Sequence, residues 1–208
     1  MTRLRDCVLA ACDAVEGARD QLTELDSVAG DGDHGTTMTI AARNIRARLA
    51  AAPGATGSDL IRQVAMGVGS VGGAIGPIYA TALLRIASRP PEQAVTVAEL
   101  RACAEAAEEA VMGLGKAKPG DKTVLDALHP VVESLRASEA GGEDVAAAVA
   151  GAARAARAGA GETAGMIATL GRASRLGERS RGWADPGATS FAIAIEAIAA
   201  ALGAPARG

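Results

Sequence analysis

Apolar residues recur at intervals of three and four positions along most of this chain, which is the spacing of helices that bury one face. The first such run extends from Leu4 to Leu22, and a second is expected to end near Ala52. No segment alternates apolar and polar residues as a half-buried strand would. We therefore predict an all-α protein of about eight helices with short connectors, forming one domain over residues 1–208.

Turn and capping residues indicate where several of these helices begin. Thr96-Val-Ala-Glu99 is a capping-box pattern, and Asp185-Pro186 places an N-cap before a proline at the first helical position. Asp121 is expected to cap a sixth helix. A seventh helix, rich in alanine, should begin near Glu143 and extend to about Thr169.

Composition narrows the kind of core that the protein can form. Hydrophobic residues make up 49% of the 208 residues but aromatic residues only 1%, so the core must consist of Ala, Leu, Val and Ile, which suits closely packed helices. The formal net charge of −3 gives no basic surface of the kind that binds nucleic acid.

The cysteines and the first residues indicate a cellular location. Cys7, Cys12 and Cys103 are odd in number and lack the spacing of a zinc site or disulfide framework, which favours a reducing compartment. Acidic residues follow soon after the start, so no signal-peptide core is present. No run approaches the roughly 18 apolar residues of a membrane span. A soluble, cytoplasmic protein is expected, with no membrane partner.

One short stretch, Asp26–Met38, concentrates the chemically interesting side chains. Asp26, Asp31, Asp33 and His34 fall within nine positions and alternate with glycines that allow a tight loop. Carboxylate oxygens are the ligands that Mg²⁺ prefers, and a helix that starts at about Thr36 would present free backbone N–H groups to phosphate. This stretch predicts a metal–nucleotide site.

The stretch has two other interpretations. A solvated Asp/Gly turn is the common origin of an isolated Asp-Gly-Asp sequence. A calcium-binding EF-hand fits poorly, because it needs a glutamate at the twelfth loop position and the twelfth residue counted from Asp26 is Thr37.

Two glycine-rich segments resemble named motifs without their context. Gly67–Gly72 matches G-x-G-x-x-G, but no strand precedes it, and Gly115–Thr123 is a Walker-A-like loop with one residue too many. Both still open onto predicted helix starts, as do Gly35-Thr36 and Asp185–Gly187. If several such starts met at one end of a bundle, they would cradle a polyphosphate; separately, each is an ordinary helix connector.

Four motifs in matching order resemble the nucleotide-binding L subunit of dihydroxyacetone kinases (the DhaL family), over residues 5–203. They are Gly30-Asp-Gly-Asp-His-Gly35, Ser70-Val-Gly-Gly-Ala74-Ile-Gly-Pro77, Lys118-Pro-Gly-Asp-Lys-Thr123, and Gly171-Arg-Ala-Ser174 with Asp185-Pro-Gly-Ala-Thr-Ser190. The resemblance implies a barrel of eight antiparallel helices that binds ADP or ATP at one end through two Mg²⁺ ions.

The resemblance also implies a role for individual residues. It assigns no protein nucleophile. His34 is expected to form a hydrogen bond with the phosphates, and the alternative is that it acts as a phosphorelay histidine. The implied metal ligands are Asp26, Asp31 and Asp33; the phosphate contacts are His34, Gly35, Thr36, Thr37, Gly73, Ala74 and Ile75; Gly115 and Val124 would border the base or ribose, and Arg172, Asp185, Pro186 and Gly187 would close over the nucleotide.

In this family a separate K subunit or domain holds the keto-sugar, and the absence of a K-like region here fits a free-standing subunit. Either ATP exchanges as a substrate, or bound ADP is recharged by a phosphocarrier of the sugar phosphotransferase system. The rival interpretation is a non-catalytic metal–nucleotide module that docks on a regulator. Two positions depart from the family pattern: Ile75 replaces a usual serine and Thr37 a usual asparagine.

Overall fold

The computed structural model describes residues 2–89 and 95–203, and every regular element in these ranges is helical, as predicted. The elements, in chain order, are α1 (Thr2–Gly17), α2 (Arg19–Ala29), α3 (His34–Ala51), α4 (Gly57–Val68), α5 (Ile75–Ala87), α6 (Val97–Gly115), α7 (Leu125–Ala140), α8 (Val145–Glu162), the 3₁₀ segments η1 (Thr163–Gly165) and η2 (Ala173–Ser180), and α9 (Pro186–Gly203).

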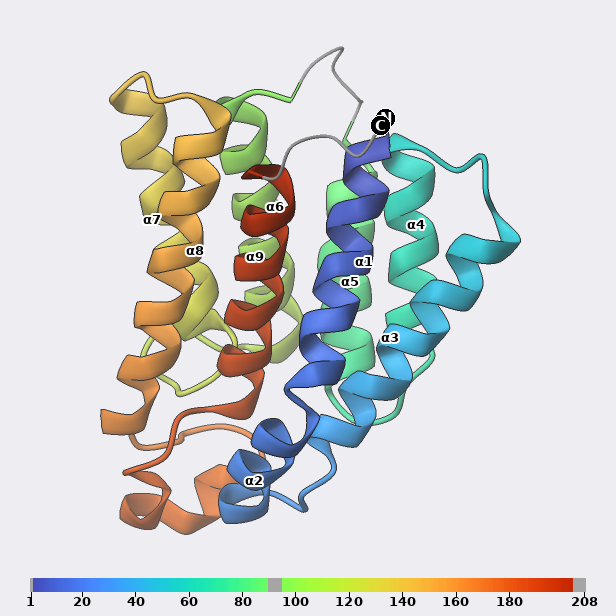
Figure 1. The fold of residues 1–208 in the computed structure, drawn as a ribbon. Coiled ribbons are helices and arrows are strands. Elements are labelled where there is room, and N and C mark those ends of the chain that lie inside the picture. The colour runs from blue at the N-terminus through green and yellow to red at the C-terminus, as the bar shows by residue number, and fades with distance from the viewer. Residues whose placement is uncertain (1, 90–94, 204–208) are drawn as a thin grey trace.

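Eight of the helices form a closed ring. Helices α3 to α9 each pack against the next in sequence, α1 packs against α3, and α9 returns to α1. Figure 1 shows the resulting up-and-down barrel, with α2 lying across its lower end against α3 and α9. The expected barrel of about eight antiparallel helices is therefore confirmed.

The first apolar run forms two helices and not one. The chain leaves the helical conformation at Ala18 (φ −92°, ψ 8°), so that α2 starts at Arg19 and turns away from α1. Leu22 keeps the apolar rhythm because it is fully buried at this corner, beside Val15 and Met38. The apolar spacing therefore continues through the bend at Ala18, because residues on both sides are buried, and it does not show that the helix breaks there.

Two predicted helix ends are correct in detail. Thr96 Oγ1 accepts from Glu99 N at 3.2 Å while Thr96 N donates to Glu99 Oε2 at 3.0 Å, which completes the capping box of α6. Asp185 Oδ1 accepts from Ala188 N at 2.7 Å at the start of α9. In both cases the cap and its partner lie within one helical turn, so the sequence contains the whole interaction.

Two other predicted ends are wrong, and one pair of contacts explains both. Asp121 does not cap α7, which begins at Leu125; its buried carboxylate instead accepts from Lys118 N at 2.8 Å and from Thr169 Oγ1 at 2.6 Å. Thr169 N also donates to Asp121 O at 3.3 Å, so this residue belongs to a loop and α8 ends at Glu162.

Small residues allow the helices to approach closely, as the shortage of aromatic residues requires. Ala148 and Ala156 of α8 are fully buried in a cluster with α7 and α9. A Cβ added to Gly159 would lie 2.2 Å from the carbonyl oxygen of Asp126, so α7 and α8 touch backbone to backbone there.

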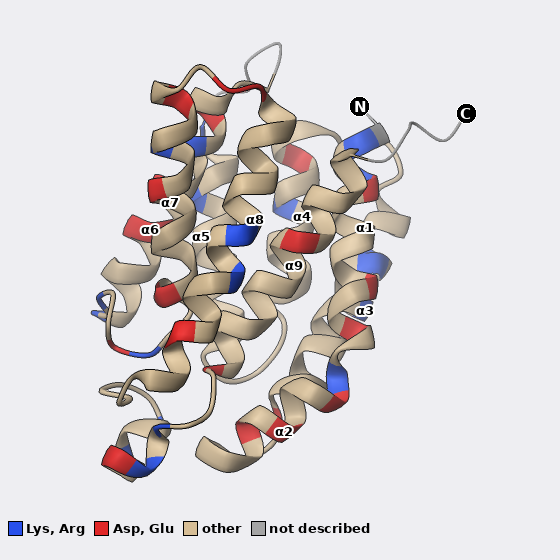
Figure 2. Cartoon of the chain, turned by 60° about the vertical axis from the view of Figure 1, so that its left-hand side comes forward, with Lys and Arg blue, Asp and Glu red and all other residues tan. Residues whose placement is uncertain are grey.

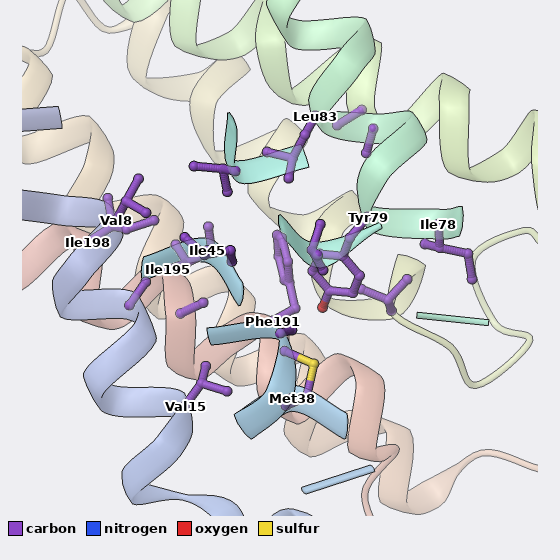
Figure 3. Close-up of a pocket in the computed structure, with 18 of the residues that line it drawn as sticks. Val8, Val15, Met38, Ile45, Ile78, Tyr79, Leu83, Phe191, Ile195 and Ile198 are labelled. Carbon is purple, nitrogen blue, oxygen red and sulfur yellow. The ribbon is translucent and has the colours of Figure 1, made fainter. Parts of the chain in front are cut away.

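The barrel interior contains an apolar cavity of about 340 Å³. Figure 3 shows Tyr79 and Phe191 reaching into it beside Met38 and branched aliphatic side chains. Alanines complete the wall, which explains why side chains do not fill the centre of the ring.

Charges are distributed over the outside of the barrel. In the view of Figure 2, acidic and basic residues alternate along the outer helix faces without forming a surface of one sign. Arg101 and Arg136, for example, share Glu105 between α6 and α7.

Helix α9 has the length and mean hydropathy (1.4) of a membrane span, alone among the helices in the described ranges. The sequence analysis expected no such run. It packs against α1 and α8 in the barrel.

Candidate functional site

The three predicted metal-binding carboxylates lie together at the end of the barrel that α2 crosses. Asp26 lies in the last turn of α2, Asp31 in the connecting loop and Asp33 at the residue before α3. One oxygen from each lies within 4.8 Å of the others. Asp31 and Asp33 are exposed and Asp26 is half-buried, so the cluster faces outward and has room for a cation without a packing change.

Glycines around the cluster allow a close approach of the backbone. A Cβ on Gly30 would lie 2.1 Å from Asp26 Oδ1, and one on Gly35 would lie 2.1 Å from the carbonyl oxygen of Arg19. Gly32 has φ +73°, a conformation that favours glycine. These positions hold α3 against α2 and keep the acids close together.

Asp26 also organises the first turn of α3. Its Oδ2 accepts from Asp33 N at 2.8 Å and from His34 N at 3.1 Å. Helix α3 begins at His34, two residues before the predicted start. The N–H groups of Gly35 and Thr36 have no acceptor within the helix, so they can donate to an anion beside the acid cluster.

Arg172, which precedes η2, forms an ion pair with Asp31. Both side chains are about half exposed, so water weakens this pair. The contact brings Arg172 to the acid cluster; its expected closure over a nucleotide stays a prediction. The set of three carboxylates with a single guanidinium beside them fits a divalent cation that shares its coordination with an anionic ligand.

The His34 side chain lies elsewhere than expected. The ring is buried and its Nε2 lies 2.9 Å from Ser190 Oγ on α9, so it faces the barrel and not the first-turn N–H groups. Ser190 Oγ also lies 3.0 Å from Gly187 O, so this serine links the His34 ring to the first turn of α9. Burial lowers the pKa of His34 from its usual value, which favours the neutral ring.

The second glycine turn lies before α5. Gly73 has φ +74° and, like Ala74, is exposed, so both are accessible to a ligand. Ile75 is different, because its side chain packs beside Met38 in one apolar cluster and Val71 in another. Its side chain is therefore part of the wall behind the turn, and a charge placed there would disturb the barrel as well as any ligand.

The loop between α6 and α7 supplies the remaining candidates. Gly115 ends α6 in an exposed position, and Val124 directly precedes α7, about 4.0 Å from the position of a Cβ on Gly187. Asp126, which the sequence analysis missed, holds this loop: its carboxylate accepts from Gly120 N at 2.5 Å and from Thr123 N at 2.7 Å.

Asp185 and the Pro186-Gly187 start of α9 lie next to that loop. Asp185 N donates to Thr163 Oγ1 at 2.8 Å, which attaches the turn to η1. Burial raises the pKa of the Asp185 carboxyl to about 6, with the nearby Asp126 acting in the same direction and Lys122 against it.

We expect Asp185→Asn to gain stability relative to the unaltered protein as pH rises. Because its pKa is raised in the folded protein, Asp185 contributes most to the free energy of unfolding below about pH 4. This contribution is lost as pH rises through 6. Asparagine caps the helix and does not ionise, so its advantage should grow by about 2 kcal/mol between pH 4.5 and 7.5. Urea unfolding at both pH values measures it. Asp144→Asn is the matched control, because Asp144 caps α8 from an exposed position; an equal pH effect in both variants would contradict the argument.

Figure 1 shows how the fold gathers these parts: the starts of α3, α5 and α9 all lie toward the end where α2 crosses the barrel. The structure brings the acids, Arg172 and the first turn of α3 together, and separately joins Val124 to Gly187. The side chains of Ser190, Asp126 and Thr163 support these parts. The partners of Ser190 (His34) and Thr163 (Asp185) lie far away along the chain, so the sequence carried no local sign of them. Those of Asp126 lie three and six residues before it, where a local pattern was present but was assigned to Asp121 instead.

The sequence is similar to those of known proteins. The sequence matches the DAK2 domain over residues 28–200. It is 39% identical over 184 residues to "PEP-dependent dihydroxyacetone kinase, ADP-binding subunit DhaL" of Escherichia coli (strain K12), covering 88% of each chain. It is 34% identical over 198 residues to the D-erythrulose kinase of Mycolicibacterium smegmatis, covering 91% of this chain and 33% of that protein.

The fold is also similar to a solved structure. The dihydroxyacetone kinase from C. freundii, in complex with AMP-PNP and Mg²⁺, aligns with a TM-score of 0.70 and 26% identity, over 93% of this chain and 33% of that one. The chain thus spans most of the E. coli subunit but about a third of the two larger kinases.

Proposed function

This chain belongs to the DAK2 domain family, and we propose that it is the nucleotide-binding L subunit of a dihydroxyacetone-type kinase. It binds ADP or ATP with Mg²⁺ and presents a phosphoryl group to a keto-triose or keto-tetrulose held by a separate protein. The observation that carries the proposal is the cluster of Asp26, Asp31 and Asp33 beside the first turn of α3. The extent of the domain match supports treating residues 1–208 as a single nucleotide-binding domain.

The three aspartates would hold two Mg²⁺ ions. When bound, Mg²⁺ supplies positive charge that neutralises the phosphate oxygens and orients them for transfer. The chain's own contribution is positioning: Asp26 fixes the first turn of α3, and Gly35 and Thr36 offer their N–H groups to phosphate oxygens, with Thr37 beside them. No side chain of this protein acts as the nucleophile. The His34 ring faces the barrel and supports the start of α9 through Ser190.

The other groups enclose the nucleotide. Gly73 and Ala74 contact phosphates from the second glycine turn, with Ile75 behind them. Gly115 and Val124 border the base or ribose, and Arg172 closes over the phosphates together with the turn formed by Asp185, Pro186 and Gly187. Arg172 then exchanges its contact with Asp31 for the charge of the nucleotide.

The partners are proposed from the extent of the matches to longer kinases. A K-type subunit holds the keto-sugar, since the chain matches only about a third of the larger kinases. The words "PEP-dependent" and "ADP-binding" in the name of the E. coli relative favour bound ADP recharged by a phosphocarrier over exchange of ATP. The chemistry suits the cytoplasm, where the free thiols of Cys7, Cys12 and Cys103 stay reduced.

Binding of Mg·ADP tests the proposal directly. Calorimetric titration should show one nucleotide per chain, and EDTA should abolish the signal. Mg·ADP should raise the melting temperature by mass action and slow hydrogen exchange first at residues 26–38, 70–77 and 185–190. Absence of binding, or protection confined to another part of the barrel, would contradict a nucleotide site at this end.

A further inference from the structure

Lys122 is a buried cation with an unusual set of partners. Only 4% of its surface is exposed, and no carboxylate among the described residues lies within ion-pair distance of its ammonium group. Nζ instead donates to three backbone carbonyl oxygens, those of Met166 at 3.3 Å, Ser180 at 2.5 Å and Trp183 at 2.7 Å. Three acceptors match the three protons of a lysine ammonium, so the group is fully paired without a counter-ion.

These carbonyls belong to one segment, which we call the cap: residues 166–185, from the end of η1 to the N-cap of α9. Met166 lies at its beginning, and Ser180 and Trp183 lie near its end. Lys122 itself belongs to the loop before α7 and has φ +62°, a conformation that non-glycine residues adopt rarely. One side chain therefore joins both ends of the cap to the loop that carries Val124.

The cap bears residues that the proposed function needs. Arg172 extends from it to Asp31, and its last residue, Asp185, begins the turn at the start of α9. Ser180 ties the cap internally, since its Oγ accepts from Ala168 N at 3.0 Å and donates to Gly177 O at 2.6 Å. Asp121 of the same loop also holds the cap, because it accepts from the hydroxyl and the N–H of Thr169. Among the described contacts, Lys122 is the side chain of that loop that binds the backbone at both ends of the cap.

We infer that Lys122 is a positioning residue that holds the cap closed over the nucleotide and so sets the place of Arg172 and of the Asp185 turn. This inference rests on the proposed function for its ligand, but the closure itself is a property of the free protein. Burial lowers the pKa of Lys122, with Asp185 acting against this effect, which agrees with an enclosed ammonium group.

The test compares Lys122→Met with Lys118→Met, the same replacement at an exposed position in the same loop. Lys122→Met removes the donor and leaves three carbonyls unpaired, so the cap should open in most molecules. If about one molecule in ten keeps it closed, the apparent Kd for Mg·ADP rises about tenfold. Trp183, the only tryptophan of the chain, should shift its emission to longer wavelength, and hydrogen exchange should accelerate in residues 166–185 but not in α1.

A measurement on the unaltered protein covers the case in which Lys122→Met does not fold. The sequence contains three lysines, Lys116, Lys118 and Lys122, so acetylation of each is resolved by mass spectrometry. Lys122 should react much more slowly than the two exposed lysines, and Mg·ADP should slow it further.

The outcomes separate the two proposals. Lys122 acetylated as fast as Lys118, or Lys122→Met with unchanged cap exchange, would overturn the closure. An open cap with unchanged Mg·ADP affinity would overturn the positioning role. So would a loss of affinity that occurs only when hydrogen exchange also accelerates throughout the barrel. If the unaltered protein does not bind Mg·ADP, the proposed function fails, while cap exchange and lysine labelling still decide the closure.

Discussion

Asp31→Ala and Asp33→Ala should each weaken Mg·ADP binding about 100-fold or more, equivalent to about 3 kcal/mol. Each replacement removes one of three carboxylates whose oxygens converge within 4.8 Å. Both side chains are exposed, so the change removes no packing and the helices should persist by circular dichroism. Calorimetric titration with ADP in excess Mg²⁺ measures the loss.

The choice between the three acids matters for this test. Asp26→Ala would also remove the acceptor of Asp33 N and His34 N, so its effect would mix metal binding with unravelling of α3. Glu24→Ala is the matched control, because Glu24 is an exposed acid on α2 close to the cluster but outside it. Affinity near that of the unaltered protein in both Asp31→Ala and Asp33→Ala would refute the assignment of the metal ligands.

Removing acids should affect the metal-free protein differently. Three carboxylates that converge without a cation repel one another, and among the described residues Asp31 alone of the three pairs with a guanidinium. Asp33→Ala therefore should leave the melting temperature unchanged or raise it slightly in EDTA, and the stabilisation by Mg·ADP should disappear.

Local interactions explain what could be predicted from the sequence. The capping box at Thr96 and the helix N-cap at Asp185 each link residues three positions apart. The acid cluster lies within eight residues, Asp26 to Asp33. The helical class followed from apolar spacing alone. These features need no knowledge of the distant chain.

Features that depend on distant partners were missed or misplaced. Asp121 looks like a helix cap until Thr169, 48 residues away, takes its carboxylate. The ring of His34 contacts Ser190, 156 residues away, a partner that the sequence did not indicate, and its expected phosphate contact stays a prediction. Lys122 carries no sign of its role, because all three of its partners are backbone carbonyls of another loop, which have no residue signature.

The departure at position 75 illustrates the same limit. From the sequence, an isoleucine in place of a usual serine means a lost hydroxyl near phosphates. In the structure the side chain packs beside Met38 and Val71, so the branched alkyl group extends the apolar wall of the barrel. The exposed backbone of Gly73 and Ala74 remains available at the turn.

The purified chain should not phosphorylate dihydroxyacetone or a tetrulose with ATP by itself. Its candidate site offers carboxylates, helix N–H groups and Arg172, all suited to a nucleotide. The sole exposed aromatic side chain in the described ranges that could stack on a sugar is Trp183. Phosphoryl transfer also requires the acceptor hydroxyl to be held in line with the phosphate, a task that we propose for the separate K-type subunit.

Activity should appear when a K-type subunit from the same genome is added. A coupled assay of keto-sugar phosphate formation would then show turnover either from ATP, or from a phosphocarrier with ADP retained on this chain through purification. The mixture containing Asp33→Ala should stay inactive and the one containing Glu24→Ala active, because only the former loses the nucleotide. Turnover of a triose or tetrulose by the chain alone would refute the division between subunits. Mg·ADP binding without activity in any such mixture would instead favour a nucleotide-sensing module.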